Sequence, residues 1–322
     1  MKKPAPMRDD PWSGIGIAAD HFVGRRVPGE HPLDIYWIKG VDGSPGLLLR
    51  GVDQCSVPRQ LPKPRGITLE VAPGNDRVEA RMFLREHQDR EVFLTLCRDV
   101  IAYSGSSSTA SDATSNVFRR LTHWHSLMTH ARTIAMAPHE IRGLIGELCV
   151  LERLCMSVGF DAALGAWVAP DDHPQDFANG NRLLEVKARL SGARHIVRIS
   201  SLQQLEPAQL PLVLVVVELA SADGPDTATL NQICARLVCR ARELGSHQVD
   251  AIEMALFKRG YIQMEAYDAD AYRITGIMAF ECRDDFPRLV RSEVDARIPE
   301  AQYMIDMSLI GGFAITAASV LD

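Results

Sequence analysis

The sequence predicts a mixed α/β (α+β) protein, and three observations predict it. Short apolar segments separated by turn residues dominate residues 1–104, which is typical of strands. Longer segments with apolar residues at three- and four-residue spacing follow at residues 116–135 and 138–158. Several short strand-like segments then lead to the uninterrupted apolar run at residues 212–217. Helices interleaved with strands in this way predict a sheet with helices packed against it.

The first hundred residues predict a β-rich module. Turn residues separate strand-like segments at residues 34–38, 46–50 and 66–71. The apolar spacing of residues 92–104 fits either a helix or a last strand. A run of small polar residues at 104–111 has no apolar side chain larger than alanine to bury, so we expect a flexible connection there. The predicted boundaries are an N-terminal β-rich module at residues 1–104 and a linker at residues 105–115.

The predicted core spans residues 116–225. After the helix at 116–135, Pro138 opens a second helix with Glu140 in its first turn, and Gly159 ends it. The segments that follow predict strands, with a short helix from Ser201, and they lie at residues 166–169, 175–178, 182–189, 195–200 and 212–219. A C-terminal mixed helix and strand extension at residues 226–322 is expected to pack on this core. Its predicted helices lie at residues 230–244 and 249–258, and its predicted strands at residues 271–281 and 302–310.

Composition excludes several classes of protein. Thirty-five Lys and Arg residues against 41 Asp and Glu residues give a net charge of −6, which argues against an indiscriminate polyanion binder. No apolar stretch approaches the ~18 residues of a membrane span, and no apolar secretory region follows the amino terminus, so we expect a cytoplasmic protein. The seven cysteines form no Cys-x-x-Cys pair, which argues against a zinc site or a disulfide framework and favours buried, reduced thiols. No phosphate-binding glycine loop is present.

The segment at residues 175–188 carries the chemistry. Asn179 and Gly180 both tolerate the positive φ of a type I′ turn, so they predict a β-hairpin. A two-residue loop fits either at Asn179-Gly180 or at Gly180-Asn181, and the sequence leaves both registers open.

Both registers place Asp176, Glu185 and Lys187 on one face of the hairpin, because side chains alternate along a strand. In the first register Asp176 faces Leu183 and Glu185 lies on the next diagonal. In the second register Asp176 faces Glu185 directly. The opposite face is apolar and carries Leu184, Val186 and Ala188.

Two carboxylates that face each other are costly unless a cation lies between them. Mg²⁺ suits such a pair, since it prefers oxygen ligands, and Mn²⁺ is a candidate substitute. A bound ion polarises a phosphate and lowers the pKa of a water molecule. Lys187 would orient or deprotonate that water and stabilise charge on the phosphorane. The segment therefore predicts metal-assisted phosphodiester hydrolysis.

These residues resemble the strand signature of the PD-(D/E)XK nuclease superfamily. Asp176 followed by Glu185-Val186-Lys187 matches that signature, and Gln175 departs from it where the superfamily name has proline. Residues 137–220 carry the resemblance by motif. The run is most similar to a group known as PD-(D/E)XK motif proteins, which often accompany restriction or phage-defence genes.

The resemblance implies a restriction-endonuclease-like αβββαβ core and a magnesium-dependent DNA endonuclease. It assigns metal binding to Asp176, Glu185 and the Val186 carbonyl, and it gives Lys187 the role of serving the water. Gly146-Glu147 matches the helix acid of the superfamily, which would assist through metal or water. On a helical wheel Glu147 and Glu152 both border the apolar stripe, so geometry alone leaves both open.

A local basic segment supplies the expected DNA contacts. Residues 182–198 contain five basic residues and one acid, a net charge of +4, which leaves −10 for the rest of the chain. The predicted nucleic-acid contacts are Arg182, Arg189, Arg194, Arg198, Ser201 and Gln204. DNA is the implied partner; restriction or defence proteins and a second copy of the chain are further candidates, and a membrane is not. The alternative function is a non-catalytic nuclease-fold subunit that binds DNA or serves as a scaffold in a defence complex.

Overall fold

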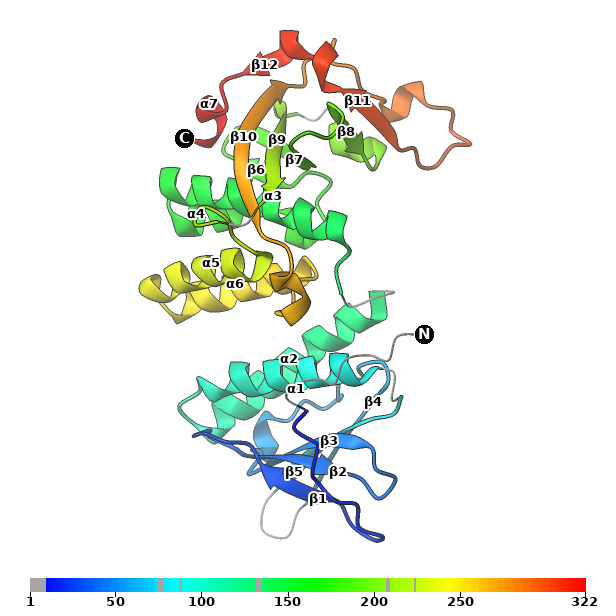
Figure 1. Cartoon of the computed structure of the whole chain (residues 1–322), viewed down its shortest axis with the longest axis vertical. Coiled ribbons are helices and arrows are strands. Elements are labelled where there is room, and N and C mark those ends of the chain that lie inside the picture. The colour runs from blue at the N-terminus through cyan, green and yellow to red at the C-terminus, as the bar shows by residue number, and fades with distance from the viewer. Residues whose placement is uncertain (1–9, 74–77, 87–88, 131–134, 207–208, 223) are drawn as a thin grey trace. The chain divides into compact units, whose positions relative to one another are not determined.

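A computed structural model describes residues 10–73, 78–86, 89–130, 135–206, 209–222 and 224–322 (Figure 1). The chain forms two compact units, Met1–Ile134 and Ala135–Asp322. Both units contain helices and sheets, which confirms the predicted mixed α/β class.

The first unit is an antiparallel sheet with two helices. Its strands are ordered β1-β2-β3-β5-β4. Trp12 is fully buried, stacks on Phe93 of α1, and donates a hydrogen bond from Nε1 to the carbonyl oxygen of Gly46 at 2.8 Å. The three strands predicted from turn spacing are confirmed as β2, β3 and β4. The elements are β1 (Val23–Arg26), β2 (Asp34–Lys39), β3 (Pro45–Arg50), β4 (Ile67–Pro73), β5 (Val78–Leu84), α1 (Arg90–Gly105) and α2 (Ala110–His130).

The small-polar run that predicts a flexible linker forms a helix cap. Thr109 accepts a hydrogen bond from the backbone N–H of Asp112 at 3.0 Å and donates one to its carboxylate at 2.8 Å, so α2 begins at Ala110 rather than at residue 116. Helix α2 packs on α1 within the first unit, where Arg120 and Trp124 both donate to Asp99. The predicted boundary at residues 104–115 is therefore wrong, because small polar residues favour helix caps as well as flexible chain. The predicted end of this helix, Ala135, is not helical; α2 is described as far as His130, and residues 131–134 lie outside the described residues.

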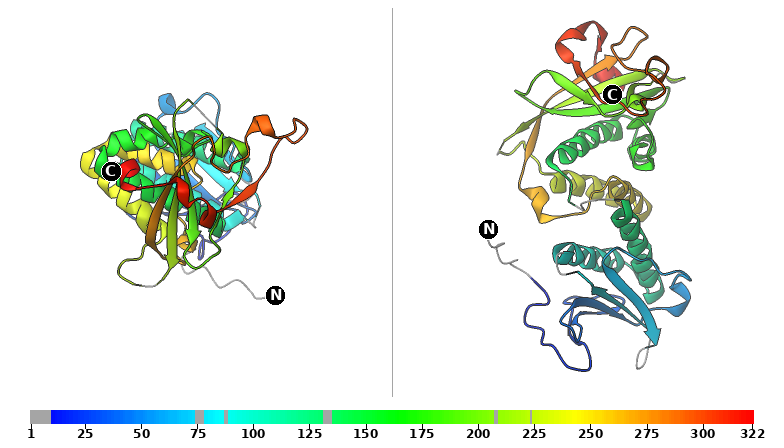
Figure 2. Two further views of the ribbon diagram at one scale, coloured as in Figure 1. Left: turned by 90° about the horizontal axis from the view of Figure 1, so that it is seen from above. Right: turned by 90° about the vertical axis from the view of Figure 1, so that its right-hand side faces the viewer.

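The second unit contains a five-stranded sheet with helices packed against it (Figure 2). The strand order is β12-β10-β9-β7-β6, with β7 and β9 parallel and the other pairs antiparallel. Strands β8 and β11 form a separate two-stranded sheet. The helices are α3 (Pro138–Ser157), α4 (Phe160–Ala166), α5 (Leu230–Leu244), α6 (Ser246–Lys258) and α7 (Ala318–Leu321), with a 3-10 turn, η4, at Leu202–Leu205. The strands are β6 (Phe177–Asn179), β7 (Arg182–Leu190), β8 (Ile196–Ile199), β9 (Leu212–Ser221), β10 (Tyr272–Glu281), β11 (Tyr303–Asp306) and β12 (Ala314–Ile315).

Two predictions for this unit need correction. Residues 166–169 predict a strand, but Ala166 ends α4 and Ala169 begins a 3-10 turn at Ala169–Asp171; Trp167 between them is extended and forms an isolated antiparallel bridge with Phe177. The residues beyond 226 do not form an extension on a finished core. Strand β10 pairs with β9 along its whole length, so the C-terminal segment completes the central sheet.

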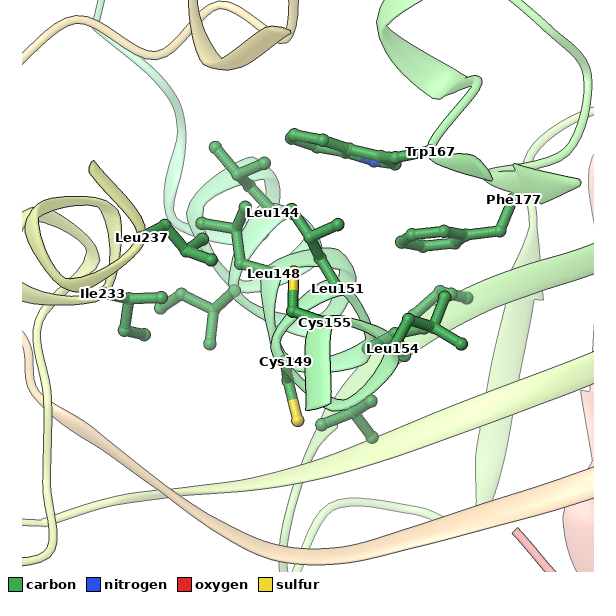
Figure 3. Packing of buried hydrophobic residues seen from close by; sticks show 14 of the residues in the cluster. Leu144, Leu148, Cys149, Leu151, Leu154, Cys155, Trp167, Phe177, Ile233 and Leu237 are labelled. Atoms are coloured by element: carbon green, nitrogen blue, oxygen red, sulfur yellow. The ribbon is translucent and has the colours of Figure 1, made fainter. Parts of the chain in front are cut away.

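Helix α3 is covered on two sides, which explains its long run of buried residues (Figure 3). One side packs on the sheet, and the other packs on Ile233 and Leu237 of α5. Gly146 lies where the helix comes closest to β7. A Cβ atom on Gly146 would lie 3.1 Å from the Cβ atom of Ala188 and 3.6 Å from Cγ1 of Val186. The absence of a side chain at residue 146 therefore sets how closely α3 approaches the strand that carries Glu185.

We expect Gly146→Leu to destabilise the second unit by about 2 kcal/mol, because its side chain would overfill the contact between α3 and β7. Gly143→Leu on the same helix is the matched control, since nothing lies within 4 Å of its Cβ position. The control is expected to be neutral or to gain up to about 1 kcal/mol of helix propensity. Chemical denaturation of the two variants measures the difference, and equal stabilities would contradict the close contact.

Of the described residues, no helix combines the length and the apolar character that a bilayer crossing requires. All seven cysteines are free. Five of them are buried as predicted, whereas Cys55 and Cys239 are exposed.

Candidate active site

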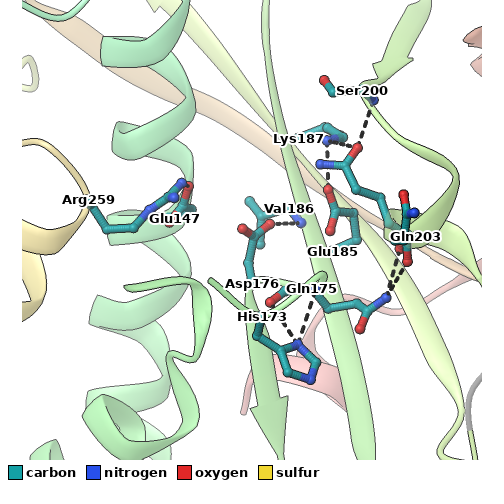
Figure 4. A network of polar contacts seen from close by, with 11 residues as sticks. Glu147, His173, Gln175, Asp176, Glu185, Val186, Lys187, Ser200, Gln203 and Arg259 are labelled. Carbon is teal, nitrogen blue, oxygen red and sulfur yellow. Dashed lines mark hydrogen bonds and ion pairs between the residues drawn. The ribbon is translucent and has the colours of Figure 1, made fainter. Parts of the chain in front are cut away.

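The hairpin adopts the second of the two open registers (Figure 4). Phe177 pairs with Leu184 and Asn179 pairs with Arg182, so Gly180-Asn181 is the two-residue loop. Gly180 has a φ of 61°, and Asn181 has no positive φ. A type II′ turn requires a positive φ at its first central residue only, which Gly180 supplies. The type I′ turn predicted from Asn179-Gly180 is therefore wrong.

Asp176 caps the open end of the strand pair. Its backbone N–H donates to the carbonyl oxygen of Leu184 at 3.0 Å, and its Oδ2 accepts a hydrogen bond from the Val186 N–H at 2.7 Å. Beyond Asp176 the β6 strand offers no backbone carbonyl to the Val186 N–H, so the Asp176 carboxylate accepts that hydrogen bond instead. This bond fixes Asp176 beside the backbone between Glu185 and Lys187.

Glu185 is the most deeply buried carboxylate of the site. It is 1% exposed, and its Oε2 accepts no hydrogen bond from any residue that the structure describes. The Lys187 Nζ atom lies 2.6 Å from its Oε1 as an ion pair. A buried carboxylate oxygen without a donor is costly, so this oxygen pair is suited to a cation.

A polar network holds Lys187 from the other side. Gln204 of η4 accepts hydrogen bonds at its Oε1 from the Lys187 Nζ at 2.9 Å and from the Ser200 backbone N–H at 2.8 Å. Gln175 is 5% exposed and donates from Nε2 to the carbonyl oxygens of Gln203 and Gln204. Gln175, which stands where the superfamily name has proline, therefore anchors the turn that positions Lys187.

Glu147 lies on α3 and is engaged by two donors. Arg259 donates from Nε to its Oε2 at 3.0 Å and forms a second hydrogen bond to its Oε1. The Trp167 indole Nε1 donates to Oε2 at 3.0 Å. Glu152, the alternative on the helical wheel, pairs with Arg236 of α5 away from the hairpin. The wheel could not separate the two acids because the deciding partners lie about a hundred residues further along the chain.

The electrostatics of the site raise the pKa of two carboxyls. Burial raises the pKa of Asp176 well above its ordinary range, and the charges of Glu147 and Glu185 raise it further. Burial raises the pKa of Glu185 to about 7, although the Lys187 ammonium opposes the increase. Both shifts arise mainly from burial, which disfavours the ionised carboxylates.

The donor set fits a hard divalent cation. Among the described residues, no group of three or more His, Cys, Asp or Glu side chains is arranged to hold a metal ion, so a site here has two carboxylates and needs other oxygens. The Leu183 and Ser191 N–H groups point to β9, so the alternate residue Val186 points its N–H and its carbonyl to the open edge. Asp176, Glu185 and the Val186 carbonyl therefore supply oxygen atoms from adjoining positions of the hairpin.

The structure separates the predicted DNA contacts into two groups. Arg189 is 7% exposed, pairs with Glu218 and donates to the carbonyl oxygens of Ala193 and Arg194, so the prediction that it contacts DNA is corrected. Gln204 is likewise engaged with Lys187. Ser201 is half-buried at the start of η4. The arginines that keep an exposed surface are Arg182, Arg194 and Arg198, of which Arg182 donates to the Ser319 carbonyl and Arg198 to Gln302.

Sequence reasoning missed Arg259 and Trp167. Arg259 lies at the end of α6, 112 residues from its partner Glu147, and no local pattern marks it. Trp167 follows α4, in the segment that predicts a strand. Only the packing of α4 and α6 around the start of β6 brings both donors to Glu147.

Comparison with known proteins agrees with the motif. No curated protein and no solved structure matches the chain. A family model described as "Putative PD-(D/E)XK family member, (DUF4420)" matches residues 8–308, which is nearly the whole sequence. The chain therefore belongs to the DUF4420 family, a family described as having PD-(D/E)XK character.

Proposed function

We propose that this protein is a magnesium-dependent DNA endonuclease, with a role in restriction or phage defence. One observation carries the proposal. The buried Glu185 carboxylate, whose Oε2 accepts no hydrogen bond from any described residue, forms an ion pair with Lys187, and the Asp176 carboxylate binds the N–H of Val186 between them. Membership of a family with PD-(D/E)XK character supports the same chemistry.

Each residue has a role in this proposal. Asp176, Glu185 and the Val186 carbonyl would hold the divalent ion, which when bound polarises the phosphate and lowers the pKa of a water molecule. Lys187, oriented by Glu185 and Gln204, places its ammonium where it orients the water and stabilises charge on the phosphoryl oxygens. In-line attack of the water then leaves 5′-phosphate and 3′-hydroxyl ends. Arg194 and Arg198 would bind the DNA backbone through their exposed guanidinium groups.

Metal binding is the first test. In calorimetry, we expect the wild type to bind Mn²⁺ and Mg²⁺, and we expect Asp176→Asn to weaken Mn²⁺ binding at least about tenfold, or about 1.4 kcal/mol, because it removes a charged ligand. Asp306→Asn is the matched control, since this exposed Asp caps a turn through Ser308 away from the hairpin. Plasmid nicking in Mg²⁺ by the wild type and not by Asp176→Asn completes the test. Equal nicking by both proteins would indicate a contaminant and end the assignment.

The second candidate is a non-catalytic DNA-binding or scaffold subunit. Its supporting observation is that Glu147 and Glu185 are both already paired with side-chain cations. DNA binding that persists without any Mg²⁺ or Mn²⁺ binding at Asp176 and Glu185 would favour this candidate over the endonuclease.

A further inference from the structure

Arg259 is held in place by the way α6 ends. The Gly260 N–H donates to the carbonyl oxygen of Phe257, and the Tyr261 N–H donates to that of Leu256, both at 2.9 Å. Gly260 has a φ of 83°, which these two bonds require and which glycine adopts without strain. Arg259 therefore leaves the helix from a fixed backbone position directed at Glu147 (Figure 4).

The Arg259 pair occupies most of the acceptor capacity of Glu147. Its guanidinium bonds both carboxylate oxygens, and Trp167 bonds Oε2 as well. Glu147 is only 4% exposed, so water cannot replace these donors easily. Glu185 differs, since Lys187 contacts its Oε1 while its Oε2 accepts no hydrogen bond within the described part of the chain. Both oxygens of the α3 carboxylate are thus occupied by donors, whereas the β7 carboxylate keeps one oxygen for a metal ion.

The Arg259–Glu147 ion pair affects the net charge of the whole site, and this charge limits how many metal ions the site can hold. Three carboxylates, those of Glu147, Asp176 and Glu185, interact electrostatically, and two cations, Lys187 and Arg259, lie among them. With all five groups ionised, as metal binding requires of the ligand carboxylates, one negative charge remains uncompensated. One divalent cation more than compensates this charge and leaves a positive site for one phosphate, while a second ion would meet no free carboxylate.

We propose that Arg259 is a positioning residue that keeps Glu147 out of metal coordination and so limits the site to a single divalent ion. This inference rests on the proposed metal site at Asp176 and Glu185. It reassigns Glu147 from an assisting metal ligand to the partner of Arg259.

Mn²⁺ titration followed by calorimetry and electron paramagnetic resonance tests the inference. We expect one ion per chain in the wild type and in Arg259→Lys, which keeps the charge. Glu147→Gln should also bind one ion, with its Kd within about threefold of wild type. Arg259→Met should bind two ions, because it frees a carboxylate beside Asp176. The double variant Arg259→Met/Glu147→Gln should return to one ion, an effect that a purely structural ion pair would not produce.

The outcomes separate this inference from the proposed function. Two ions in the wild type, or a loss of tenfold or more in Mn²⁺ affinity in Glu147→Gln, would overturn the role of Arg259 and leave the nuclease proposal intact. If Arg259→Met does not fold, the Glu147→Gln measurement still decides. One bound ion without DNA cleavage would overturn the nuclease proposal and leave the role of Arg259 standing. A wild type that binds no Mn²⁺ would overturn both.

Discussion

Lys187→Met is expected to lower the rate of Mg²⁺-dependent plasmid nicking about a thousandfold, equivalent to about 4 kcal/mol of transition-state stabilisation. The side chain of methionine has nearly the same length but carries no charge and no N–H donor. It therefore cannot orient the water or stabilise charge on the phosphoryl oxygens. Because Lys187 is not itself a proposed ligand, Mn²⁺ affinity should stay the same or increase once the cation that competes for Glu185 is removed.

The comparison of binding with cleavage gives this prediction its specificity. Lys258→Met is the matched control, because Lys258 is an exposed lysine of the same unit that forms a surface ion pair with Asp171. This control should keep both metal affinity and nicking rate, since exposed ion pairs contribute about 1 kcal/mol or less. If Lys187→Met nicks DNA as fast as the wild type while binding Mn²⁺, Lys187 has no part in the chemistry.

Glu185→Gln is expected to stabilise the metal-free protein by about 3 kcal/mol at pH 8. The folded-state pKa of Glu185 is about 7, against an ordinary value of 4.5, with burial as the main cause. Each unit of such a shift corresponds to about 1.4 kcal/mol. Because the folded state holds its proton more tightly than the unfolded state, stability is lost as the pH rises from about 4.5 to 7. Glutamine has no proton to lose, so the variant avoids this loss.

The same argument fixes the pH dependence of the effect. At about pH 4.5 and below, Glu185 is protonated in the folded state and carries little charge cost, so the two proteins should differ little there. Hydrogen exchange of the β9 amides measures this difference in the second unit alone, which matters because a two-unit chain need not unfold in one step. Glu243→Gln, an exposed change on α5, serves as the control and should shift stability by less than about 0.5 kcal/mol. A wild type that is more stable than Glu185→Gln at pH 8 without metal would contradict the assigned burial cost.

Both predictions follow from a trade between stability and function. A buried acid with one oxygen that accepts no hydrogen bond is unfavourable for folding, and proteins retain such groups where a ligand is to be bound. Saturating Mg²⁺ should reverse the order of stability, because it binds the wild type and not Glu185→Gln.

Much of the fold follows from local sequence. The limits of α3 were predictable because Pro138 and Gly159 bracket a single apolar periodicity, and β9 was predictable from an uninterrupted apolar run. The segment at residues 104–111 was not predictable in the same way. Its small polar residues suit a flexible chain and a helix cap equally, and only the packing of α2 on α1 selects the cap.

In the candidate site too, some features follow from local sequence and others are set only by tertiary packing. The sequence by itself places Glu185 and Lys187 on one face of a strand, because strand alternation is a property of consecutive residues. Only the tertiary structure decided which register the hairpin takes, that Arg189 is buried against Glu218, and that Arg259 neutralises Glu147. The physical reason is that a buried charge takes its partner from whichever segment packs against it. Chain folding brings that segment near from far along the sequence, where no local pattern records the contact.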